Sequence, residues 1–334
     1  MKILVTGGAG YVGSHTAKAL ARAGFEPIAF DNLSAGHRWA VKWGPLIEAD
    51  LGDQPSLKRA LAEHNVAAAM HFAAHAYVGE SVRDPRRYFE NNVANTLHLL
   101  HALMDAGIRH LVFSSSCAVY GLPQSLPISE SHPKLPVNPY GDSKLFVERV
   151  LDWYGRAYGL RWAALRYFNA AGADPDGELG EVHNPETHLI PRVMEAALGG
   201  LESIEIYGND YPTADGTAIR DYVHVSDLAE AHVAALKHLL SGRESLAVNL
   251  GTGRGASVRE VIAAVERVSG CAVKCTLGPR RPGDPPQLVA DPAEAEKLLG
   301  WRPSLSALDN IVRSAWDWHR RDVSAQRVEA HPQK

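Results

Sequence analysis

Residues 2–13 read KILVTGGAGYVG, an apolar run that passes directly into a glycine-rich turn. The apolar residues at 3–5 predict a short strand, and residues 11–23 have apolar positions at helical spacing. A glycine-rich turn between a strand and a helix brings backbone N–H groups to a helix N-terminus, where phosphates bind well. The GxxGxxG pattern therefore predicts a phosphate-binding turn at the start of a βαβ unit.

The rest of the first half alternates between short apolar runs and helical patterns. Strand-like runs cover residues 27–30, 46–49, 66–72, 110–114 and 161–167, and helical patterns cover residues 57–61, 88–104 and 140–158. Strands that alternate with helices form parallel sheets with right-handed crossovers. We therefore predict the α/β class, with a doubly wound Rossmann parallel sheet in residues 1–170.

The second half has a different character. Residues 172–185 are rich in Gly, Pro, Asp and Glu, and the elements that follow are shorter. We expect residues 171–325 to form a smaller C-terminal α/β lobe that binds the substrate, with some segments, such as 220–239, packed back on the first domain. Residues 326–334 are expected to be a frayed tail.

Composition excludes several classes of function. The chain carries 34 Lys+Arg and 38 Asp+Glu, so its net charge of −4 lacks the basic excess typical of nucleic-acid binding. No apolar run approaches the roughly 18 residues that span a bilayer, and the N-terminus has no signal-peptide pattern. We expect a cytoplasmic protein with no nucleic-acid or membrane partner.

The cysteines and histidines form no pattern typical of a metal site. Three cysteines, Cys117, Cys271 and Cys275, are too few for a disulfide scaffold and are typical of a reducing compartment. Cys271 and Cys275 lack two further ligands, and the His71 and His75 pair falls on a strand and a loop. We therefore expect no metal ion.

An acidic residue lies at the predicted end of the second strand. Asp31 follows the glycines by roughly 20 residues, where a carboxylate accepts hydrogen bonds from ribose hydroxyls and repels a 2′-phosphate. This position favours NAD over NADP, and a simple Asp-Asn turn is the alternative interpretation. Asp50, at the end of the third strand, is expected to border the adenine.

Tyr140 and Lys144 are four residues apart and so share one face of a predicted helix. A tyrosine with an ordinary pKa of about 10 is a poor base at neutral pH. A neighbouring ammonium group and a nicotinamide cation both favour the phenolate and lower that pKa. The hydroxyls of Ser114, Ser115 and Ser116 end a strand, where ligands meet a parallel sheet. Together these residues predict a site for proton transfer.

Several motifs resemble known families. TGGAGYVG (6–13), SSSCAVYG (114–121), Tyr140-x-x-x-Lys144 and LRYFNAAG (165–172) are similar to motifs of the extended short-chain dehydrogenase/reductases. HFAAHAYVGES (71–81), GNDYPTADGTAIRDYVHVSDLAEAHV (208–233) and PRRPGD (279–284) narrow the resemblance to the UDP-glucose 4-epimerase family. The resemblance extends from residue 1 to about residue 320.

The resemblance implies roles for individual residues. Tyr140 would act as base and acid, Lys144 would hold the nicotinamide ribose, and Ser116 would bind the sugar 4-oxygen. The other implied NAD contacts are Gly7, Gly10, Tyr11, Val12, Gly13, Asp31, Asn32, Asp50, Leu51, Phe72, Ala73, Ala74, Asn91 (or Asn95), Ser114 and Tyr167. The implied substrate contacts are Ser116, Tyr140, Asn169, His188, Leu189, Tyr207, Arg220, Tyr222, Arg281 and Asp284.

The implied substrate contacts divide by the part of the nucleotide they reach. Asn169 would reach the diphosphate, and Leu189 and Tyr207 would contact the uracil. Arg220, Arg281 and Asp284 would bind the diphosphate and the uridine ribose. Two guanidinium groups suit this role because they bind phosphate oxygens in a bidentate way.

Three positions depart from the pattern of the family. Ala76 replaces a lysine that some members place near the cofactor, and His188 replaces a common asparagine. Leu288 stands where many members have a tyrosine that guards the sugar pocket. The identity of the sugar therefore stays open.

The resemblance implies interconversion of UDP-galactose and UDP-glucose through a transient 4-keto sugar, with tightly bound NAD. Epimerases of UDP-pentoses (xylose or arabinose) or of UDP-N-acetylhexosamines are the alternatives. A 4,6-dehydratase would need an Asp-Glu pair where this chain has Cys117 and Ala118. A non-catalytic NAD sensor would not need the Tyr/Lys pair. The resemblance also implies a homodimer, in which helices 88–104 and 140–158 form a four-helix bundle across a two-fold axis.

Overall fold

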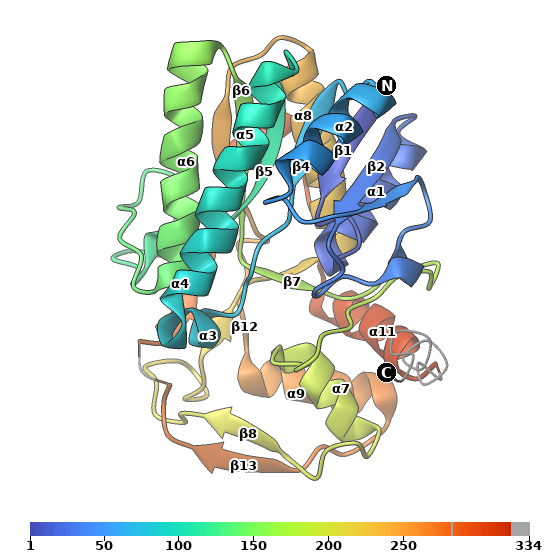
Figure 1. The fold of residues 1–334 in the computed structure, drawn as a ribbon. Coiled ribbons are helices and arrows are strands. Elements are labelled where there is room, and N and C mark those ends of the chain that lie inside the picture. Colours follow the sequence, from blue (N-terminus) through green and yellow to red (C-terminus); the bar gives the residue numbers. More distant parts are fainter. Residues whose placement is uncertain (282, 322–334) are drawn as a thin grey trace.

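The computed structural model describes residues 1–281 and 283–321. Its main sheet has seven strands in the order β11-β6-β5-β4-β1-β2-β3, and every pairing is parallel. The strands are β1 (Lys2–Thr6), β2 (Glu26–Asp31), β3 (Leu46–Glu48), β4 (Ala68–His71), β5 (His110–Ser116), β6 (Arg161–Tyr167) and β11 (Leu246–Leu250). The predicted doubly wound Rossmann sheet is confirmed (Figure 1).

Helices cover both faces of this sheet. One face packs against α1 (Tyr11–Arg22) and α8 (Val225–Leu240), and the other packs against α2 (Gln54–His64), α5 (Asn95–Asp105) and α6 (Pro139–Tyr158). Successive β1 side chains alternate between the two layers, because Ile3 and Val5 join the first core and Leu4 joins the second. Burial on both faces explains why the strands are almost wholly apolar.

The helical run predicted over 88–104 is not one regular helix. It begins with α4 (Pro85–Tyr88), continues through a π-helical segment, η2 (Phe89–Ala94), and ends as α5. Asn92 in the π-helical segment accepts a bond from His75 N (2.8 Å) and donates one to His75 O (3.0 Å). These bonds connect the loop after β4 to the helix and favour the wider π-helical turn. The periodicity of the sequence does not show this turn.

The second lobe is built from three helices and several short strands. α7 (Leu189–Ala197), α9 (Val258–Ser269) and α11 (Leu308–His319) surround a separate apolar core, and β8 (Ile204–Tyr207) pairs with β13 (Cys275–Gly278) at its outer edge (Figure 1). The remaining elements are α3 (Val78–Arg83), α10 (Ala293–Leu299), β7 (Asn169–Ala171), β9 (Ile219–Arg220), β10 (Tyr222–His224), β12 (Ala256–Ser257), β14 (Gln287–Leu288), η1 (Arg38–Ala40) and η3 (Cys117–Tyr120).

The chain crosses between the two lobes more than once. After the first segments of the second lobe, α8 packs against α1 and β11 pairs with β6 in the main sheet. The division at residues 170 and 171 stays a prediction, and the tail at 326–334 lies outside the described residues. Among the described helices, none has the length and apolar character needed to cross a membrane.

Candidate active site

The glycine-rich turn lies between β1 and α1, as predicted. Gly7 has a φ of 70°, and a Cβ there would lie 2.6 Å from Ala73 N in the loop after β4. A Cβ at Gly13 would lie 2.1 Å from Gly7 O. Only glycine fits these contacts. The N–H groups of Gly7, Ala9 and Gly10 already donate within the protein, so the groups that face a ligand are those of the first turn of α1.

Asp31 ends β2 beside this turn. Its Oδ2 accepts a hydrogen bond from Ala9 N (3.0 Å), and its Oδ1 accepts one from Leu33 N (2.8 Å). Burial raises the pKa of the Asp31 carboxyl, whereas these two bonds and the nearby His37 lower it. The backbone bonds thus fix the carboxylate at the edge of the sheet, next to the glycine turn.

The Asp50 carboxylate accepts hydrogen bonds from three neighbouring groups. It accepts hydrogen bonds from Asn32 Nδ2 (2.6 Å), Gly52 N (2.7 Å) and Asn95 Nδ2 (3.3 Å). Asn91, the other asparagine considered from the sequence, instead donates to Asn92 Oδ1 (3.0 Å). The two asparagines therefore have different partners, although both line one cavity of about 550 Å³ together with His75.

The residues predicted to transfer protons come together at the ends of β5, β6 and α6. Tyr140 lies in the first turn of α6, which starts where Asn138 Oδ1 caps Gly141 N (2.8 Å). Lys144, one turn later, donates to Ser114 O (2.8 Å), and its Nζ lies 5.8 Å from the Tyr140 ring centroid. The hydroxyls of Ser114 and Tyr167 are 2.6 Å apart. The predicted pairing of phenol and ammonium is thus present in the fold.

Burial controls the electrostatics of this group. It lowers the pKa of Lys144 to about 7, and the nearby Glu148 carboxylate opposes that shift. Burial also raises the pKa of Tyr140 well above its ordinary value, and the hydrogen bond with Ser116 opposes this. From the sequence we expected Lys144 to lower the pKa of Tyr140, whereas in the structure burial of the phenol raises that pKa. The protein's own groups therefore keep Tyr140 protonated at neutral pH.

The second lobe holds two of the arginines predicted to bind the substrate. Arg220 on β9 pairs with Asp284, and Leu288 on β14 is its register partner across the strands. The Arg281 guanidinium lies 4.1 Å from the centroid of the Tyr207 ring. Four of the predicted substrate residues thus form two pairs, each containing one guanidinium that suits a phosphate.

Known proteins resemble this chain closely over nearly its full length. The NAD dependent epimerase/dehydratase family matches residues 3–251. The chain belongs to this family. A UDP-glucose 4-epimerase of Rhizobium leguminosarum bv. trifolii is 52% identical over 319 residues, which cover 96% of this chain and 97% of that protein. The resemblance drawn from the motifs is therefore confirmed.

Solved structures agree with this assignment to the epimerase/dehydratase family. UDP-glucose 4-epimerase from Brucella ovis in complex with NAD is 54% identical with a TM-score of 0.93, covering 95% of this chain and 97% of that one. UDP-glucose-4-epimerase from Stenotrophomonas maltophila, with bound NAD and formylated UDP-arabinopyranose, is 40% identical with a TM-score of 0.94. That comparison covers 97% of this chain and 99% of the other.

A buried ion pair that was not predicted from the sequence lies beside Lys144 and the end of β5. Arg166 on β6 contacts Glu148 on α6 through two bonds, Nε–Oε1 (2.8 Å) and Nη2–Oε2 (2.5 Å). Glu148 also accepts from Ser115 Oγ (2.6 Å), and Arg166 donates to the Tyr120 hydroxyl (2.9 Å). The network holds β5 and β6 against α6. The position of Glu148, four residues after Lys144, was the available signal.

The structure also gives the partners or the burial of four other residues that were predicted to contact NAD or the substrate. Tyr11 donates its hydroxyl proton to Gly172 O (2.6 Å), and Asn169 donates to Asp221 O (3.0 Å). Tyr222 on β10 is partly buried, and burial raises its pKa to about 12. His188, directly before α7, faces the carboxylates of Glu181 and Glu186. His188 is therefore already paired with carboxylates from its own loop.

Proposed function

We propose that this protein is a UDP-glucose 4-epimerase that interconverts UDP-galactose and UDP-glucose through a transient 4-keto sugar. The observation that carries the proposal is the Tyr140, Lys144 and Ser114 group, which lies at the sheet edge that also bears the glycine turn. The membership of the chain in an NAD-dependent epimerase family supports the same reaction class.

The residues at the edge of β1 and β2 fit NAD. The close contacts around Gly7 and Gly13 leave the N–H groups of the first turn of α1 to bind a diphosphate, and Asp31 has a carboxylate placed for the ribose hydroxyls. When bound, NAD supplies a hydride acceptor that later returns the hydride to the sugar. Because the overall reaction has no net redox change, the cofactor stays in place through each cycle.

The protein's own residues move the proton. We assign Tyr140 as the base that removes the 4-hydroxyl proton and later returns it, and Ser116 as the donor to the same sugar oxygen. Lys144 is held by Ser114 O and is placed to bind the nicotinamide ribose. Since burial disfavours the Tyr140 phenolate, the positive charge of the bound cofactor is needed to make this phenol an effective base.

The second lobe is expected to hold the nucleotide rather than the sugar. Arg220 and Arg281 supply two guanidinium groups for the diphosphate, with Asp284 and Tyr207 beside them. Firm binding of UDP leaves the sugar free to turn over within its pocket between the two hydride transfers. The binding energy of the nucleotide thereby supports chemistry at a distant carbon.

A dehydratase is disfavoured by the residues that follow β5. A 4,6-dehydratase needs proton-transfer groups there, whereas this chain has a thiol at Cys117 and a methyl group at Ala118. Burial raises the pKa of Cys117 to about 12, so the thiol cannot exchange protons readily at neutral pH.

Pentose and N-acetylhexosamine nucleotides remain the second candidate substrates. Leu288 packs at the edge of the small apolar cluster that contains Phe168 and Cys117, and it lies beside Arg220. A leucine at this position leaves more room than the tyrosine of many relatives. Steady-state kinetics with UDP-galactose, UDP-arabinose and UDP-N-acetylgalactosamine would decide, and a large pentose preference would overturn the hexose assignment.

The decisive experiment needs no added cofactor. The purified protein is expected to interconvert UDP-galactose and UDP-glucose unaided and to release NAD on denaturation. Deuterium at sugar C4 should be retained in the isomer. Loss of that label to the solvent or to free coenzyme would contradict the proposal.

We also propose a homodimer in the cytoplasm. Phe146 and Trp153, seven residues apart and so on the same side of α6, are large apolar side chains that are 47% and 65% exposed. α5 lies beside α6 (Figure 1), where the rings of His101 and Tyr154 stack at 6.3 Å. A helix pair of this kind forms a four-helix bundle with its symmetry mate. A light-scattering mass near that of one 36.2 kDa chain at micromolar concentration would contradict the dimer. The three unpaired cysteines support a reducing compartment.

A further inference from the structure

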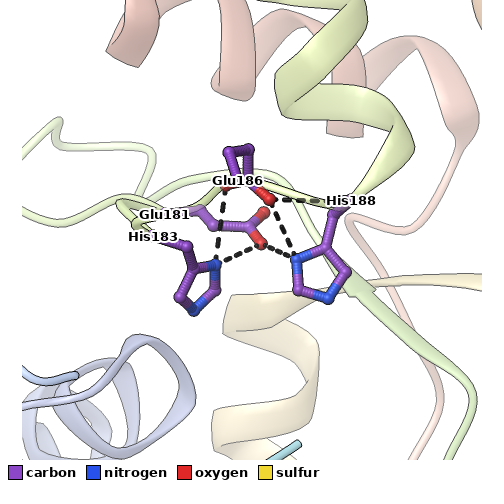
Figure 2. A group of neighbouring side chains, drawn as sticks. All are labelled: Glu181, His183, Glu186 and His188. Atoms are coloured by element: carbon purple, nitrogen blue, oxygen red, sulfur yellow. Dashed lines mark hydrogen bonds and ion pairs between the residues drawn. The ribbon is translucent and has the colours of Figure 1, made fainter. Parts of the chain in front are cut away.

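A compact group of histidines and carboxylates lies in the loop that leads into α7. Residues 181–188 read EVHNPETH, and the donor atoms of Glu181, His183, Glu186 and His188 all lie within 4.8 Å of one another. Figure 2 shows both imidazole rings turned toward the two carboxylates. We call these four residues the loop cluster. The catalytic steps described above do not use it as a unit.

The distances in the loop cluster suit a single small ion. His183 Nδ1 lies 3.1 Å from Glu181 Oε1 and 3.5 Å from Glu186 Oε2. His188 Nδ1 lies 2.7 Å from Glu181 Oε1 and 3.2 Å from Glu186 Oε1. Donor atoms that bind Zn²⁺ tetrahedrally at about 2.0–2.2 Å are about 3.3–3.6 Å apart. The four side chains are therefore close to the spacing of a tetrahedral site.

Three members of the loop cluster are shielded from solvent, whereas the His188 side chain is 47% exposed. The Glu181 side chain is 4% exposed, and those of Glu186 and His183 are 16% and 19% exposed. A cavity of about 30 Å³, lined by these three residues, adjoins the cluster and is large enough for one water-sized occupant. His183 Nδ1 is buried and makes no hydrogen bond within the described residues, although the Glu181 oxygen is near. This nitrogen thus points between the carboxylates rather than at either of them.

We propose that Glu181, His183, Glu186 and His188 bind one divalent transition-metal ion of the Zn²⁺ type. Two carboxylates balance the charge of the ion, and two imidazoles with two carboxylates form a donor set that suits such ions. From the sequence we expected no metal ion. The proposed ligands come from a loop without cysteines, which carries no familiar metal-binding pattern.

A second acidic group in the molecule makes a useful contrast. Asp174, Asp176 and Glu178 also lie close together, but Lys18 Nζ contacts all three carboxylates at 2.6–2.8 Å. A protein cation already compensates these charges. No lysine or arginine ion pair to Glu181 or Glu186 occurs within the described residues. The groups that contact these carboxylates are the two imidazoles and, at Glu186 Oε1, the backbone N–H groups of Thr187 (2.7 Å) and His188 (2.8 Å).

The position of the loop cluster suggests a structural role for the ion. The Tyr11 ring lies edge-on to His183 at 6.3 Å, and the Tyr77 ring lies 6.1 Å from His183 and 6.4 Å from His188. Tyr11 belongs to the glycine turn, and Tyr77 belongs to the loop after β4. An ion that fixes the cluster would therefore hold the start of α7 against both cofactor-binding segments.

Equilibrium dialysis of the full-length protein against Zn²⁺, after treatment with EDTA, tests the site. We expect one ion per chain and a rise in the thermal midpoint. The double variant His183→Gln, Glu186→Gln should weaken binding by about 100-fold or more, since loss of even an outer partner of a metal ligand costs about 10–100-fold. The matched control Glu63→Gln, His64→Gln changes the same residue types at the end of α2 and should bind as the original chain does.

Absence of Zn²⁺ binding by the original chain, or equal binding by both double variants, would overturn the proposal. X-ray absorption of the Zn²⁺-loaded original chain gives a second test that does not depend on the folding of any variant. Two imidazole nitrogens and two carboxylate oxygens are expected in the shell. A shell without imidazole would also overturn the proposal.

Discussion

The carboxyl edge of the main sheet and the second lobe position their polar side chains in different ways. At the sheet edge, Lys144 donates to the main-chain carbonyl of Ser114, and strands and a long helix fix both partners. In the second lobe, Arg220 is held by Asp284, and His188 by Glu181. Backbone contacts keep the reacting groups in one geometry, whereas ion pairs between side chains can exchange partners when an anionic nucleotide arrives.

The largest loss of catalytic turnover is expected for a substitution at the sheet edge. Tyr140→Phe removes the proposed base but keeps the ring, so turnover should fall by about 10³-fold, within the usual range for a general base. NAD released on denaturation should be unchanged, because the glycine turn is intact. Assays of kcat beside the NAD content measure both. Unaltered turnover would remove Tyr140 from its assigned role.

A change in the second lobe should affect binding rather than chemistry. Arg220→Met removes a charge-assisted contact and should raise KM by about 10–100-fold with little change in kcat. The matched control is Arg280→Met, which removes a guanidinium that pairs with exposed Asp210. A fall in kcat of the same size would mean that Arg220 acts at the reacting sugar.

Acid should destabilise the first lobe through its buried histidines. Burial lowers the pKa of His232 to about 4, so below the unfolded value of about 6.5 only the unfolded chain takes up the proton. The resulting loss of stability begins as the pH falls through 6.5, reaches about 2 kcal/mol at pH 5 and is complete near pH 4. Urea unfolding at pH 7 and pH 5 should show a smaller loss for His232→Leu. Equal losses would exclude this group.

The smallest effect is expected on the choice of sugar. Leu288→Tyr adds a ring beside Arg220 and should lower kcat/KM for UDP-N-acetylglucosamine relative to UDP-glucose by about 10-fold. Parallel assays with both substrates measure the ratio. If the ratio does not change, Leu288 does not line the sugar pocket.

Sequence periodicity revealed the parts of the site that regular elements position. The glycine turn, Asp31 and the Tyr140/Lys144 pair follow from a strand, a turn and a helix whose residues are near neighbours in the chain. The pair of Glu148 and Arg166 was missed because it joins a helix to a strand through side chains 18 residues apart.

Two other features depend on tertiary contacts and could not be read from local patterns. The π-helical turn near Asn92 is favoured by bonds to the distant His75 backbone. The loop cluster lies in a segment without periodicity, where neither spacing nor composition shows that the donor atoms of Glu181 and His188 converge. In both places the contacts arise only after the surrounding chain has folded.

Because the chain returns to the main sheet, the first half of the sequence depends on β11 and α8 from the second half to complete its sheet and core. Without β11, the outer side of β6 would present an unpaired row of backbone donors and acceptors, and without α8 the apolar surface of α1 would face water. A chain truncated near residue 170 would thus expose both an unpaired strand edge and an apolar helix surface. We therefore expect a chain truncated near residue 170 to self-associate.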